Sequence, residues 1–168
     1  KRRKVKQTPK RTPRTHQPKG MSLEEWQIAL RREYGREHNF QFKNLGTEPI
    51  FSEFAITNPV SGRTYRVAIR GNELGVNFCS CPDFAVNTLG TCKHIEGLLV
   101  RLGRKQGAKR LFEDGFHPPY SEVYLEYGAR RKVRFRRGVE CPSHFLREAE
   151  RFFDKDGSLR EEIVNDFE

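Results

Sequence analysis

Three of the four cysteines and one of the five histidines lie close together in the middle of the chain. Cys79 and Cys81 form a Cys-x-Cys pair, ten residues follow, and Cys92 and His94 form a Cys-x-His pair. Thiolate sulfur and imidazole nitrogen are ligands that suit zinc, and four of them complete a tetrahedron around one ion. The spacing therefore predicts one Zn²⁺ ion held by Cys79, Cys81, Cys92 and His94.

Other readings of the cysteines are less favoured. Two disulfides are conceivable, but a Cys-x-Cys pair followed by Cys-x-His is typical of a metal site. Zinc-binding thiols must stay reduced, so we expect a cytoplasmic, nucleoid-associated protein. Four protein ligands leave no open position for water, which favours a structural ion over a catalytic one. Cys141 and His144 lack a matching second pair, so we expect Cys141 to be a lone thiol.

The first ligand pair is predicted to lie at the end of a small sheet. Residues 53–57 and 63–70 have the composition and alternation of two strands joined by a turn, and residues 76–79 form a third short strand. Because side chains alternate along a strand, we expect Phe78 to enter the core while Cys79 faces the metal. A proline follows Cys81 directly and is expected to stop the strand.

One amphipathic helix is predicted before this sheet in the sequence, and another after it. Cys92 and His94 stand at the start of the second helix, which Gly103 is placed to end. The first helix begins at Ser22, where Ser22-x-x-Glu25 is a capping box, and Gly35 is expected to end it. The apolar face of the second helix would pack on the sheet and hold the second ligand pair in its first turn.

The last third of the chain predicts a hairpin followed by helices. Residues 122–127 and 131–136 read as two strands around a turn at 128–129, a helix covers 142–154, and Ser158 caps a last helix. The predicted fold class is therefore α+β: a small antiparallel sheet plus helix around one structural zinc, with a C-terminal helical extension. No apolar run approaches the about 20 residues of a membrane span.

Positive charge is concentrated in two zones. Residues 1–20 hold nine Lys or Arg and no Asp or Glu, whereas the other 148 residues hold 23 basic and 22 acidic side chains. The first zone is predicted to be a disordered basic arm, either a plain solvated tail or a segment that binds phosphate backbones. Residues 99–137 form the second zone, with eleven basic and four acidic side chains.

This second zone predicts contact with nucleic acid, most simply DNA, through its phosphates. An excess of seven positive charges in 39 residues exceeds what solubility requires, and such contacts would position the protein without reading sequence. The alternative is a solvated surface partly neutralised by the acidic C-terminal helices. The predicted contact residues are Arg104, Lys105, Lys109, Arg110, Arg130, Arg131, Lys132, Arg134, Arg136 and Arg137.

The metal motif resembles the SWIM zinc finger, whose pattern is Cys-x-Cys, a variable spacer, then Cys-x-His. More widely, phrases such as Ile56-Thr57-Asn58-Pro59 and Asn87-Thr88-Leu89-Gly90-Thr91 resemble the amino-terminal region of bacterial Swi/Snf-type helicase-like ATPases that carry such a finger. The resemblance implies an accessory domain of a DNA-dependent, ATP-dependent helicase-like enzyme. Its motor domain, a partner in the same polypeptide, is expected to lie outside these 168 residues.

These observations predict four regions and no catalytic activity in this chain alone. The regions are a basic arm at 1–20, a SWIM-type domain with its N-terminal helix at 22–103, a basic connector and hairpin at 104–137, and a helical linker at 138–168. Residues 103–110 only superficially resemble a phosphate-binding loop, since the spacing of their glycines and the residue after Lys109 are wrong for one. A rival hypothesis is a protein–protein module that docks on the motor or another partner.

Overall fold

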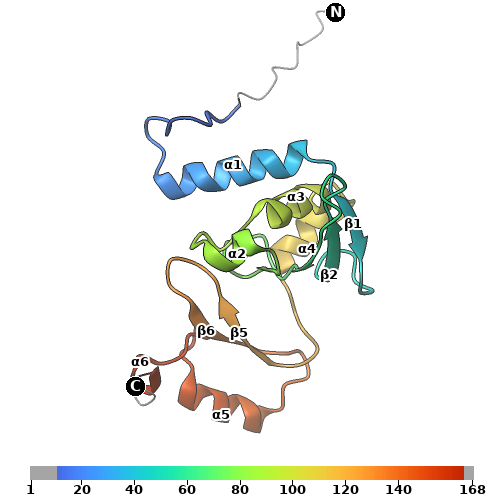
Figure 1. Cartoon of the computed structure of the whole chain (residues 1–168). Helices are drawn as coiled ribbons and strands as arrows, with labels where there is room; N and C mark the ends of the chain where they lie inside the picture. The colour runs from blue at the N-terminus through green and yellow to red at the C-terminus, as the bar shows by residue number, and fades with distance from the viewer. Residues whose placement is uncertain (1–10, 165–168) are drawn as a thin grey trace, which may run out of the picture.

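The computed structural model describes residues 11–164 of the chain (Figure 1). The elements up to the end of the finger helix are α1 (Leu23–Glu37), β1 (Gln41–Asn44), β2 (Glu53–Thr57), β3 (Thr64–Ala68), β4 (Phe78–Cys79), α2 (Pro82–Val86) and α3 (Lys93–Leu102). The later elements are α4 (Ala108–Asp114), β5 (Glu122–Glu126), β6 (Lys132–Arg136), α5 (Ser143–Phe152) and α6 (Glu161–Val164). Among the described helices, none is both long and apolar enough to cross a membrane.

Four strands form one antiparallel sheet in the order β1-β2-β3-β4. The pairing of Phe54 with Val67, and of Ile56 with Tyr65, places the apolar positions of β2 and β3 on the same face. That face is buried, and α3 lies against it, as the alternation in the sequence predicts. The mixed helix and antiparallel-sheet class is therefore confirmed, with β1 as an edge strand that the sequence pattern did not reveal.

The hydrophobic core belongs entirely to the first two thirds of the chain. Its fourteen buried members run from Phe40 to Ala108 and include the three ligand cysteines. Beyond Ala108, no described Leu, Ile, Val, Met or aromatic side chain is buried. The hairpin and the helices that follow it are thus held by contacts with the finger, by polar interactions and by partly buried contacts such as Phe135 with Phe153, not by a fully buried core of their own.

Phe78 corrects one of the predictions for this core. Its side chain is 40% exposed, on the face of β4 opposite to Cys79. It contacts Phe84 of α2 and Tyr127 at the end of the hairpin, with ring centroids 5.9 and 6.2 Å apart. The alternation with Cys79 was right, but the buried face of the sheet is the one that carries the thiol.

Gly35 does not end α1, which continues to Glu37. It is buried where α1 crosses α3, and a Cβ built on it would lie 2.6 Å from both the amide nitrogen of Gly97 and the carbonyl oxygen of Lys93. A Cβ on Gly97 would in turn lie 2.8 Å from the carbonyl oxygen of Gly35. The two glycines therefore let the helix backbones touch, a contact between residues far apart in the sequence.

The hairpin is formed as predicted and is fastened to the finger. Strands β5 and β6 pair from Glu122 opposite Arg136 to Glu126 opposite Lys132. Just beyond β5, the amide of Tyr127 donates to the carbonyl of Gly75 at 3.0 Å, and its ring lies 4.7 Å from that of Phe84. Ser158 corrects another prediction: it bridges to β6 opposite Arg134 and lies before α6, which begins at Glu161.

The last part of the predicted basic arm lies against α1. The indole nitrogen of Trp26 donates to the carbonyl of Pro13 at 2.7 Å, and the amide of Thr12 donates to the carboxylate of Glu33 at 2.8 Å. Arg14 pairs with Glu37 at 2.9 Å. Residues 1–10, where the rest of the predicted arm falls, lie outside the described residues.

The helix crossing makes a testable prediction about Gly35. In an exposed helix interior, Gly→Ala stabilises by about 1 kcal/mol, but Gly35→Ala should destabilise by about 2 kcal/mol because the new methyl meets backbone atoms of α3. Urea unfolding measures the change. Gly128→Ala is the control, since its Cβ would meet the nearest atom at an ordinary 3.8 Å. A neutral or stabilising Gly35→Ala would contradict the close crossing.

Candidate metal centre

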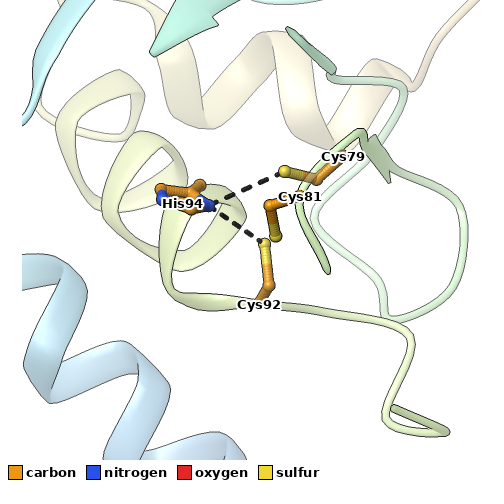
Figure 2. Close-up of side chains that lie close together, drawn as sticks. All are labelled: Cys79, Cys81, Cys92 and His94. Carbon is orange, nitrogen blue, oxygen red and sulfur yellow. Dashed lines mark hydrogen bonds between the residues drawn. The ribbon is translucent and has the colours of Figure 1, made fainter. Parts of the chain in front are cut away.

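The four predicted ligands come together from three neighbouring elements (Figure 2). Cys79 is the last residue of β4 and pairs with Val67 of β3. Cys81 is the N-cap residue of α2, and its sulfur accepts the amide of Phe84 at 3.4 Å. Cys92 is the N-cap residue of α3, and His94 lies in the first turn of that helix. The rigid strand end and the two helix starts thus hold all four side chains in one buried place.

The proline after Cys81 acts differently from the prediction. Strand β4 already ends at Cys79, and the proline instead occupies the first position of α2, where its fixed φ angle and missing N–H suit a helix start. The ten residues between the ligand pairs therefore contain a short helix. Because Cys81 caps this helix, the position of its sulfur is set by the same turn that reverses the chain.

The distances fit one tetrahedral zinc ion. The ligand atoms of the four residues all lie within 4.8 Å of one another. The Nδ1 atom of His94 lies 3.8 Å from the sulfur of Cys79 and 3.9 Å from that of Cys92. A regular tetrahedron with ordinary zinc–sulfur and zinc–nitrogen bonds has edges of about 3.6 to 3.8 Å. Three sulfurs and Nδ1 of the imidazole therefore form the ligand set.

The pKa values of the thiols show why this cluster needs a cation. Hydrogen bonds from Cys79 and then from Cys92 hold the pKa of the Cys81 thiol far below its usual range. The pKa of Cys79 is raised well above its usual range, first because its S–H is shared with Cys81 and then with Cys92. A hydrogen bond with Cys79 lowers the pKa of Cys92, but Cys81 and burial outweigh it and raise the pKa to about 12. Three thiolates can exist together here only around a positive ion.

The donor set and its burial fit a structural zinc. Four protein ligands close the coordination shell, and all four side chains are buried. When zinc is bound, its chemistry is to neutralise the thiolates and join β4, α2 and α3. No coordination position is left for a substrate or for a water that could be activated.

Several residues that the sequence pattern did not single out support the ligand segments. The guanidinium of Arg31 in α1 donates to both carboxylate oxygens of Asp83 in α2, at 3.1 and 2.7 Å. The side-chain amide of Asn87 donates to the carbonyls of Asp83 and Thr91, at 2.6 and 3.1 Å, and so closes the spacer between the ligand pairs. The Arg31–Asp83 contact joins residues far apart in the sequence, so the sequence pattern could not reveal it. Asn87 is of a type common in turns, which was the one local signal for the contacts described here.

Glu96 is a second missed residue. It is only 3% exposed, two residues after His94. One of its carboxylate oxygens accepts the hydroxyl of Thr91 at 3.0 Å, and the other accepts Nε of Arg32 at 2.6 Å. The sequence did offer a signal, since Glu96 is a charged residue among the apolar residues of α3. A carboxylate in such a place requires partners, and this could have marked Glu96 as a residue with a specific contact.

The ten predicted nucleic-acid contacts fall into two groups. Arg134 pairs with Glu126 and Asp156, each at 3.1 Å, and Arg136 pairs with Glu122 and lies over the ring of Tyr124. These two side chains are only 21% and 16% exposed, so they serve the hairpin itself. The other eight are more weakly engaged or free: Arg104, Lys105, Lys109, Arg110, Arg130, Arg131, Lys132 and Arg137.

The weakly engaged members of the second group have local partners. Lys109 and Arg110 pair along α4 with acids four residues on, at 3.7 and 3.6 Å and with highly exposed side chains. Lys105 and Arg131 donate to backbone carbonyls at 2.9 and 3.1 Å. Exposed pairs of this kind contribute little and yield to a phosphate. Four members make neither an ion pair nor a side-chain hydrogen bond within the described residues: Arg104, Arg130, Lys132 and Arg137.

Removal of a ligand tests the structural role of the ion. Cys92→Ser should release zinc and abolish cooperative unfolding of the finger, because zinc binding supplies a large share of the folding free energy in small metal domains. Zinc content per chain and thermal unfolding measure both effects. Cys141→Ser is the matched control and should keep one zinc and the original melting temperature. A Cys92→Ser protein without zinc that melts as before would refute the structural role.

The thiol pKa values also predict how zinc affinity changes with pH. In the folded cluster the pKa values of the Cys79 and Cys92 thiols are raised, so at least these two must lose protons when zinc binds. The affinity for zinc should therefore fall at least about 100-fold for each unit that the pH drops. Chelator competition between about pH 7 and about pH 8 measures the slope. An affinity independent of pH would contradict proton displacement, and a slope of three would show that Cys81 also starts protonated.

Comparison with known proteins agrees with this geometry. The model of the SWIM zinc finger family matches residues 65–103, a span that starts in β3, contains all four ligands and ends just after α3. Searches of curated proteins and of solved structures give no match. The matched span and the buried cluster together show that this chain carries a SWIM zinc finger with one structural zinc.

Proposed function

We propose that this protein is an accessory module that binds nucleic acid, most simply DNA, through its phosphates and without reading sequence. The supporting observation is the set of exposed cations without carboxylate partners at the turn and end of the hairpin: Arg130, Lys132 and Arg137. Such side chains can each replace a counterion on a phosphate backbone, which provides affinity independent of base sequence.

The ion pairs inside the hairpin support this proposal. Glu122 and Glu126 are two of the four acidic side chains in residues 99–137. Glu122 pairs with Arg136, and Glu126 pairs with Arg134. Their negative charge is therefore neutralised within the hairpin and does not oppose a phosphate at its tip. The hairpin is also fastened to the finger through Tyr127 and Arg131, so the cations are presented from a fixed surface.

We also propose that the module serves a Swi/Snf-type, ATP-dependent helicase-like motor in the same polypeptide, in the cytoplasm and near the nucleoid. The support is the resemblance of phrases in residues 56–91 to the front end of such bacterial enzymes. The closed zinc shell agrees with an accessory role, since it offers no position for catalysis. ATP hydrolysis would then belong to the motor.

One observation favours the alternative, a protein–protein module. The hairpin exposes Val123 and Leu125, and α5 exposes Phe145 and Phe152, with exposed fractions from 40% to 60%. A separate cleft of about 820 Å³ between hairpin and α5 is lined by other residues, such as Phe135. Exposed apolar side chains on two elements are typical of a surface that another protein covers. The motor domain is the partner that this reading proposes.

A salt titration tests the nucleic-acid proposal. The triple variant Arg130→Gln, Lys132→Gln, Arg137→Gln should bind duplex DNA more weakly, and the slope of log affinity against log salt should fall by about 2.7, since each phosphate contact contributes about 0.9. Fluorescence anisotropy with the full chain measures both quantities. A second triple variant with the same charge change elsewhere, Arg36→Gln, Lys43→Gln, Arg147→Gln, is the control and should keep the slope.

Two outcomes would contradict this proposal. Equal losses in both triple variants would mean that net charge alone governs binding. Absence of DNA binding by the unmodified chain even at low salt would exclude the nucleic-acid function. Tight binding to a motor-domain protein that persists at high salt, in a chain with no DNA affinity, would establish the protein–protein alternative instead.

A further inference from the structure

A cavity of about 270 Å³ lies beside the zinc ligands, on the side of the turn between β2 and β3. The turn contributes Asn58 and Arg63 to its wall, β3 contributes Tyr65, and the first turn of α3 contributes Lys93 and His94. None of the ten basic residues discussed above lines it. The cavity, called here the finger cavity, is therefore a separate feature that neither the structural zinc nor the hairpin explains.

The finger cavity carries uncompensated positive charge. Arg63 and Lys93 make no ion pair within residues 11–164. Asp83 is its acidic member, and Arg31 occupies both oxygens of that carboxylate. A zinc ion with three thiolates carries one net negative charge. The two cations outweigh it, so the cavity as a whole favours an anion.

Its hydrogen-bonding groups are mostly donors that lack acceptors. Nε2 of His94 finds no partner among the described residues, but it is buried too deeply for a ligand in the cavity to reach. The available donors are the N–H groups of Arg63, on the turn, and Lys93, in the first turn of α3. A ligand with acceptors pointing in several directions would satisfy them together.

We propose that the finger cavity binds a phosphate group. A guanidinium on the turn and an ammonium on the helix line the cavity from different elements, which suits the tetrahedral oxygens of phosphate better than the two coplanar oxygens of a carboxylate. Lys93 is already held in place, because its Nζ lies 4.7 Å from the ring centroid of Tyr34. The phosphate belongs either to a nucleic-acid backbone or to free phosphate and its small esters.

This inference stands independently of the proposed DNA binding, and inorganic phosphate is the first probe. Phosphate is added to the zinc-loaded full chain at constant ionic strength while the amide resonances of the residues around the cavity are followed by NMR. Arg63→Gln and Lys93→Gln should each weaken the binding of phosphate about tenfold, the effect of one hydrogen bond between charged groups. Arg36→Gln and Lys43→Gln remove the same charges outside the cavity and should leave the dissociation constant unchanged.

Duplex DNA is the second probe and identifies the source of the phosphate. If the cavity takes a backbone phosphate, Arg63→Gln weakens the binding of both duplex DNA and inorganic phosphate. If it takes free phosphate, Arg63→Gln weakens the binding of inorganic phosphate and leaves the binding of DNA unchanged. Zinc content and melting temperature are measured for each variant, and Arg63→Gln, an exposed residue of a turn, should preserve both. Phosphate that shifts no resonance at the cavity, or binds equally well to cavity variants and controls, would overturn the proposal.

Discussion

Zinc ligation by Cys79, Cys81, Cys92 and His94 is the interaction on which the finger depends, because the elements it joins are too short to hold themselves. Strand β4 has two residues and α2 has five, and neither is stable without tertiary contacts. Other contacts build on their positions: Arg31 binds α2 through Asp83, and Tyr127 fastens the hairpin against Phe84. Loss of the ion therefore removes the support of α2 first and that of the hairpin next.

The second constraint is the close contact of α1 with α3 at Gly35 and Gly97. It brings Arg32 within 2.6 Å of the buried carboxylate of Glu96, which would otherwise be an uncompensated charge beside the metal ligands. The N-terminal helix is thereby part of the metal domain, although it contributes no ligand. A finger without this helix would leave Glu96 without its ion-pair partner and would expose the face of α3 that contains Gly97.

The metal site could be predicted because its information is local: the order and spacing of four residues suffice. The strands at 53–57 and 63–70 and the hairpin followed from alternation, which is equally local. Strand β1 escaped because Gln41–Asn44 has one apolar residue and owes its conformation to pairing with β2. Gly35 was read as a helix end because nothing near it in the sequence shows that Gly97 would pack there. Likewise, counting arginines gives the charge of residues 99–137 but cannot tell which arginines have partners.

Whether an arginine has a carboxylate partner decides whether it is available to a ligand. Arg134 and Arg136 pair with acidic side chains of the hairpin, and these ion pairs stabilise a part of the chain that has no buried apolar core. In the finger, Arg31 and Arg32 likewise hold carboxylates that join α1 to the metal domain. Cations used in this way cannot serve a partner without loss of the fold. Positive charge available for a ligand therefore belongs to side chains that the fold does not consume, among them those at the hairpin turn and at the wall of the finger cavity.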